Sequence, residues 1–184
     1  MDQLSQSIAP TNDFKAVTDM KISDTSADAL RAFAATAETV IQKNASGATM
    51  SDMEYLQAAV ENDDASAREH LAALAKSYRD TAVGISMLPV PRDLAVIDLA
   101  IVNARMRLGE MYGDFSRVNT DPLAAMLALE QFKPTELAIE QAFTDLARLY
   151  TANGVVLENG TPGAAFVNLI SNLTARQRAA AINP

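Results

Sequence analysis

Apolar residues recur every three or four positions along most of this chain, the spacing of a helix that buries one face. The first clear run extends from about Ser26 to Asn44, and Gly47 follows it as a stop signal. Its apolar positions are Leu30, Phe33, Ala34, Ala37, Val40 and Ile41. The pattern predicts an amphipathic helix whose apolar face packs against another part of the chain.

Capping residues divide the next part of the chain into two helices. Ser51 with Glu54, and Ser66 with Glu69, have the spacing of a capping box. In that motif a hydroxyl and a carboxylate satisfy free backbone N–H groups at the start of a helix. We therefore predict one helix from Ser51 to residues 62–64 and a second from Ser66, packed as a hairpin.

Two prolines then interrupt the helical pattern. The segment Pro89-Val90-Pro91 cannot continue a helix, because proline lacks an N–H and forces the preceding residue toward extended geometry. Pro91 suits a helix start, and the apolar sequence that follows predicts a central helix reaching about Phe115. Gly109 and Gly113 lie four residues apart on it and favour close backbone packing over ligand contact.

Proline also marks the next two predicted helices. Asp121 followed by Pro122 fits a helix cap and a first helical residue, and predicts a short helix to about residue 132. Pro134 and Thr135 then predict that the helix stops and a new one begins.

The end of the chain carries the last helix signals. Gly154 is placed to end the helix that begins at Thr135, and Thr161 with Pro162 predicts another start. Thr174 predicts a final short helix, with a glutamine three residues later completing a capping box.

Composition supports the helical pattern. The chain is rich in Ala, the best helix former, and only 5% of its residues are aromatic. We predict an all-α fold, an irregular antiparallel bundle of about seven to eight helices that needs no strand pair. Residues 1–24 are expected to form a mobile leader with a weak helical turn near 14–20, and residues 25–184 a single helical domain. A helical solenoid is a minor alternative, because no second copy of any segment follows at a fixed period.

Charge and residue inventory exclude several classes of function. A net charge of −8 disfavours nucleic-acid binding. The absence of Cys excludes disulfides and thiolate metal sites. The longest apolar stretch, 94–102, contains Asp98 and is shorter than the roughly 20 residues of a membrane span. The start shows no secretory signal, which indicates either a cytosolic protein or one whose export segment or anchor has been removed upstream.

Few side chains could carry chemistry. His70 is the single histidine, which excludes a di-iron bundle site and weakens a Ser-His-Asp triad. We interpret it as a surface imidazole rather than as a ligand or base. There is no glycine-rich phosphate loop, and we expect no catalytic residue, no metal and no cofactor.

Asp98 and Arg105 are the candidate ligand-binding residues. Asp98 is the one acid within a strongly apolar stretch, and Arg105 lies two helical turns further along. A buried carboxylate without a partner is costly, so the two could bracket a polar pocket with Asn103 or Arg107 from the flanks. An exposed strip or a structural ion pair is the alternative that we favour for these residues.

Part of the chain resembles a group of bacterial proteins. The similar features are the proline segment 88–91, the apolar run 94–103, the turn and cap at 120–123, and the stop at 153–155. These resemble uncharacterised, membrane-anchored all-helical proteins of small-genome bacteria from candidate phyla, for which no activity is known. The resemblance covers less than half of the chain and implies an extracytoplasmic helical domain.

These observations lead to three hypotheses about function. The first is a non-enzymatic helical interaction or structural domain, the soluble extracytoplasmic part of a bacterial envelope or surface protein, with an unidentified protein partner. The second is a sensing or carrier protein that binds a small apolar or zwitterionic ligand near Asp98 and Arg105. The third, which we favour least, is an enzyme with an unrecognised carboxylate site. A cytoplasmic location is the alternative to the envelope.

Overall fold

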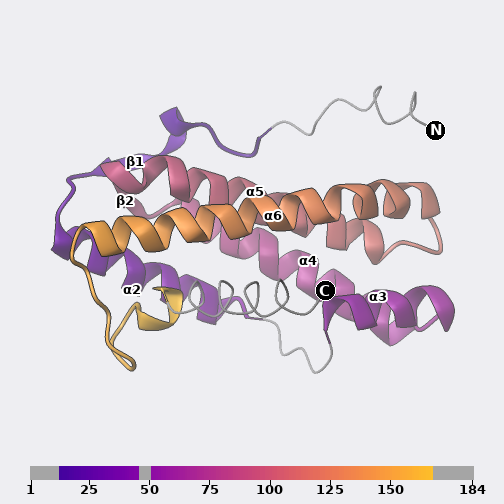
Figure 1. Ribbon diagram of the computed structural model, residues 1–184. Coiled ribbons are helices and arrows are strands. Elements are labelled where there is room, and N and C mark those ends of the chain that lie inside the picture. Colours follow the sequence, from indigo (N-terminus) through magenta and orange to yellow (C-terminus); the bar gives the residue numbers. More distant parts are fainter. Residues whose placement is uncertain (1–12, 46–50, 168–184) are drawn as a thin grey trace, which may run out of the picture.

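The computed structural model describes residues 13–45 and 51–167, which are mostly helical (Figure 1). The α-helices are α2 (Ala27–Lys43), α3 (Asp52–Glu61), α4 (Ala65–Ser86), α5 (Ala95–Phe115) and α6 (Pro122–Ala152). The short elements are the 3-10 helices η1 (Val17–Asp19) and η2 (Arg92–Leu94) and the strands β1 (Lys21–Ser23) and β2 (Pro89–Pro91). The mostly helical character predicted from the sequence is confirmed.

Two of the predicted helix starts are confirmed by their hydrogen bonds. The Ser26 hydroxyl accepts a bond from the Ala29 N–H at 3.0 Å and begins α2. Ser51 and Glu54 form the expected capping box at α3, with the Ser51 N–H donating to the Glu54 carboxylate at 2.7 Å. Each bond satisfies a donor that the first helical turn leaves free.

The predicted cap of α4 is wrong. Asp64, not Ser66, begins this helix: its carboxylate accepts from the backbone N–H groups of Ser66 at 2.8 Å and Ala67 at 3.2 Å. A carboxylate two positions earlier satisfies two donors and also carries the charge that a helix N-terminus favours. The predicted box of Ser66 with Glu69 is therefore not used.

The predicted break at Pro134 is also wrong, because residues 122–152 form the single helix α6 with Pro134 inside it. Asp121 caps it as expected, accepting from the Ala124 N–H at 3.1 Å. Pro134 lies on the exposed side, where water can bond the carbonyl that proline leaves without a donor. Phe132 and Thr135 are buried on either side of it and hold the same face against the protein.

A short parallel strand pair replaces the all-helical arrangement expected at the prolines. β1 pairs with β2 in parallel, with Ile22 opposite Val90. The two prolines hold β2 extended, and Val90 between them is fully buried. The prediction that the fold needs no strand pair is therefore wrong.

The described part of the expected leader makes specific contacts with the helices. η1 lies within the predicted weak helical turn at residues 14–20. The backbone of Lys15 is bonded twice to Asn103 of α5, donating at 2.9 Å and accepting at 3.0 Å.

The structure does not bear out the predicted antiparallel bundle of seven to eight helices. Residues 122–152 form one helix instead of two, and turns cover residues 159–163 before a helical stretch at 164–167. The predicted capping box at Thr174 lies outside the described residues. As predicted, Gly154 follows α6 with a φ of 64°.

α5 is the central helix, as predicted. It packs along α4 on one side and α6 on the other (Figure 1). Two buried apolar clusters lie along it, one around its first half with α2 and the second half of α6, the other around its second half with α3 and the first half of α6. The expected hairpin of α3 and α4 also forms.

The contact between α4 and α5 depends on Gly109. A Cβ placed there would lie 2.6 Å from the Arg79 Cγ and 3.0 Å from the Ala75 carbonyl oxygen. The Arg79 guanidinium also donates to the Gly109 carbonyl at 2.9 Å. A Cβ at Gly113, one turn later, would meet the far end of Arg79 at 3.3 Å and the Ala75 Cβ at an ordinary contact distance of 4.0 Å. The predicted close packing is thus confirmed at Gly109.

We predict that Gly109→Ala lowers the free energy of unfolding by roughly 1–3 kcal/mol, because backbone atoms of α4 must move to make room. Gly113→Ala is the matched control and should stay within about 1 kcal/mol of the parent, since alanine favours the helix and the facing guanidinium can shift. Urea denaturation of the two variants measures the difference. Equal stability of the two would contradict close packing at Gly109.

Candidate functional site

Asp98 lies inside the protein, in the first turn of α5. Its side chain is 0% exposed, and neither carboxylate oxygen has a hydrogen-bond partner among the described residues. Burial in this apolar environment raises the pKa of Asp98 to about 7. The prediction that we favoured, an exposed strip or an ion pair, is therefore wrong for Asp98.

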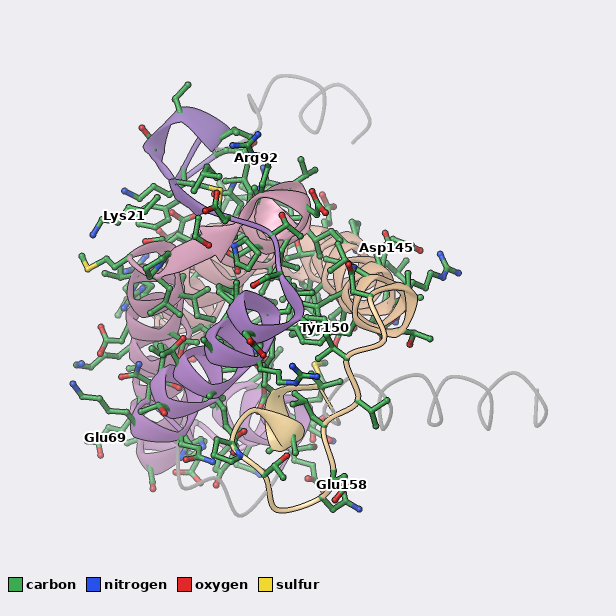
Figure 2. The ribbon with its side chains drawn as sticks, turned by 90° about the vertical axis from the view of Figure 1, so that its left-hand side faces the viewer. Lys21, Glu69, Arg92, Asp145, Tyr150 and Glu158 are labelled. Atoms are coloured by element: carbon green, nitrogen blue, oxygen red, sulfur yellow. The ribbon has the colours of Figure 1, made fainter. Side chains whose placement is uncertain are left out.

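Tyr150 of α6 is the titratable neighbour of Asp98. Its hydroxyl donates to the Leu30 carbonyl of α2 at 2.7 Å, and Figure 2 shows its side chain on the inner side of α6, with Asp145 pointing away. Burial first, and the charge of Asp98 second, raise the pKa of Tyr150. Since the Tyr150 hydroxyl already donates its proton to the Leu30 carbonyl, it does not donate a hydrogen bond to the Asp98 carboxylate.

Arg105 lies in a different environment, seven residues further along α5. That spacing corresponds to about 10 Å along a helix, and no ion pair joins Arg105 to Asp98. Arg105 lines a hollow of about 230 Å³ between α4, α5 and α6. The other lining residues are Tyr78, Leu108, Glu136, Ile139, Glu140 and Phe143. Asp98 does not line this hollow, so the structure does not bring the two predicted residues into one pocket.

Asn103 and Arg107, the flanking residues named with Asp98 and Arg105, form their contacts with the segment before β1. Asn103 bonds the backbone of Lys15, and Arg107 forms an ion pair with Asp13. Both side chains hold the segment before β1 on the surface of α5.

The guanidinium of Arg105 has no ion pair in the part of the chain that the structure describes. Its Nε is buried without a partner, and its Cζ lies 5.8 Å from the centre of the Phe143 ring. Burial lowers the pKa of Arg105, and the neighbouring Tyr78 opposes this. A guanidinium stays protonated even so, and the hollow therefore holds a cation.

Two carboxylates of α6 line the same hollow, Glu136 and Glu140. Glu136 approaches Lys133 at 3.5 Å, and neither glutamate forms an ion pair with Arg105. Neither glutamate was predicted from the sequence as a site residue. Their spacing of four residues, next to the apolar Ile139 and Phe143, was the available signal, because it puts carboxylates at the edge of a buried helix face.

Tyr78 closes the hollow on the α4 side. Its ring stacks on Tyr112 with 5.1 Å between centres, and the Tyr112 hydroxyl donates to Asp52 of α3. Burial raises the pKa of both tyrosines. This chain of contacts fixes the tyrosine wall, so one side of the hollow is preformed.

His70 is half-buried rather than a surface imidazole. Its ring stacks on Tyr55 of α3 with 3.7 Å between centres, and its Nε2 is buried without a partner. Within residues 13–45 and 51–167, no three His, Cys, Asp or Glu side chains gather in a way that could hold a metal ion.

No family model, curated protein or solved structure matches this chain. None of the helices that the structure describes has the length and apolar character that crossing a membrane requires.

We predict that Asp98 makes the stability of the protein fall as pH rises. Its pKa is about 7 in the folded state and near 3.8 as the unperturbed value, so the folded state binds more protons between these pH values. The free energy of unfolding should therefore decrease by about 1.4 kcal/mol per pH unit from this group and level off above pH 7.

The test is urea denaturation of the parent and Asp98→Asn from pH 5 to pH 8. Asparagine has the same shape but no charge, so the variant should gain stability over the parent steadily between pH 5 and 7. Parallel pH profiles for the two proteins would show that Asp98 is not buried as a neutral acid.

Proposed function

We propose that this chain is a non-enzymatic helical interaction or structural domain that binds a protein partner through the outer face of α6. We further propose that it forms the extracytoplasmic part of a bacterial envelope or surface protein, as the resemblance in its sequence implies. A cytoplasmic location is the alternative.

The apolar outer face of α6 carries this proposal. Leu123, Met126 and Leu137 are 65%, 58% and 52% exposed, and their spacing puts them on the side opposite the buried residues of the helix. Leu129, at the edge of the same side, is 51% exposed. Apolar side chains gathered along one outer helix face favour docking against another protein.

Two other functions have less support. A small-ligand sensor or carrier is favoured by one observation, the hollow that contains the unpaired Arg105. An enzyme with an unrecognised carboxylate site could not use Asp98, which is fully buried, and no observation favours Glu136 or Glu140 as its acid.

The outer face of α6 can be tested by photo-crosslinking in cells that express the natural gene. A benzophenone amino acid at the exposed position Glu130, between the apolar residues, should crosslink a discrete partner. Adding Met126→Glu and Leu137→Glu should reduce this product about tenfold or more, because two buried apolar contacts would be lost.

The matched control places Met53→Glu and Val60→Glu on α3, where both residues are similarly exposed. This pair should leave the product unchanged. A product insensitive to the α6 changes, or no product at all, would remove the proposed interaction face.

The location can be tested with a single introduced thiol, because the chain contains no Cys. Val156→Cys places it at a position that is 77% exposed. An extracytoplasmic domain should react with a maleimide that cannot cross the inner membrane before cells are lysed. Labelling only after lysis would establish the cytoplasmic alternative.

A further inference from the structure

The hollow around Arg105 combines one cation, two carboxylates and an apolar wall. We propose that it binds a small zwitterion with an apolar side chain, the chemistry of a free apolar α-amino acid. This inference rests on the second function above, the ligand sensor or carrier, and narrows its ligand to a zwitterion that also carries an apolar side chain.

Arg105 would hold the carboxylate of the ligand. Arg105 lines the hollow, its Nε is buried without a partner, and no described carboxylate forms an ion pair with it. Placing a charge at a half-buried position without a partner is costly. A planar carboxylate is the partner that an arginine fork fits best, through two parallel N–H···O bonds.

Glu136 and Glu140 would hold the ammonium group. They lie one turn apart on α6 and line the same hollow, and both are half-exposed. Their charge makes the hollow unfavourable for dicarboxylates and phosphates, and the net charge of −8 acts in the same direction. A ligand with one carboxylate and one ammonium group satisfies Arg105 and a glutamate together.

The remaining walls and the size of the hollow fix the rest of the ligand. Leu108, Ile139 and Phe143 supply apolar surface, and the ring of Tyr78 closes the α4 side. A volume of about 230 Å³ is below the roughly 300 Å³ at which sites for drug-sized ligands begin. It suits a molecule as small as leucine or phenylalanine.

The test titrates the full chain with L-phenylalanine and follows the methyl resonances of Leu108 and Ile139. Phenylalanine should shift both. 3-Phenylpropionate, which lacks the ammonium group, and phenethylamine, which lacks the carboxylate, should each bind at least about tenfold more weakly. L-Glutamate should not bind.

Three variants identify the groups involved. Arg105→Gln should abolish phenylalanine binding. Arg105→Lys keeps the positive charge and should retain part of the binding, so it provides the test if the glutamine variant does not fold. Glu136→Gln with Glu140→Gln should weaken phenylalanine but strengthen 3-phenylpropionate. Arg148→Gln, an exposed arginine of α6 paired with Asp145, is the matched control and should change nothing.

The outcomes separate the ligand class from the function. If 3-phenylpropionate or phenethylamine binds as tightly as phenylalanine and shifts the same methyl resonances, the proposal of a zwitterionic ligand is wrong. The proposal that the hollow binds a small ligand would still stand. If none of the four probes shifts these resonances at about 10 mM, the ligand class and the ligand-binding function are both overturned, because weaker binding would be of little use. Arg105 would then be a structural residue that packs on Phe143.

Discussion

The most extensive helix contact in this fold, between α4 and α5, depends on their close approach at Gly109. Because Gly109 has no side chain, the Arg79 side chain of α4 passes directly over it, and its guanidinium donates to the Gly109 carbonyl of α5. α6 contacts α5 from another side, and the hollow beside Arg105 is lined by residues of all three helices. Gly109 does not line that hollow, but it lies one turn after Arg105 on the same face of α5.

Asp98 and Arg105 show how side-chain length determines whether a titratable group on a buried helix keeps its charge. Both lie on α5, two turns apart, and both lack an ion pair among the described residues. Asp98 is too short to reach the edge of the protein, so burial favours its neutral form. Arg105 has a long stem and extends between helices to a partly open hollow, where its charge is retained. The same helix therefore holds one group that responds to pH and one that stays charged.

The sequence predicted the helices better than it predicted their interruptions. Period and capping located α2 and α3, and period alone located α5, which begins at Ala95 rather than at the expected Pro91. The break predicted at Pro134 does not occur, because a proline on an outer face costs one hydrogen bond while the buried residues around it keep the helix continuous. The strand pair could not be predicted from spacing, because its partners are far apart in the chain. For the candidate site, the sequence identified Arg105 but not the glutamates of α6, whose position beside it depends on how α5 and α6 pack.

The strand pair has a consequence for how the chain folds. β1 and β2 join Lys21 to Pro89, so forming them closes a loop of about 70 residues, whereas the helical contacts around them are mostly between neighbours in the sequence. Loop closure of this length is entropically unfavourable, and two prolines in β2 leave the ladder few N–H donors. The pairing is thus expected to form after the helices have packed and to open before they separate. The segment before α2 is therefore expected to attach last, to helices that have already packed together.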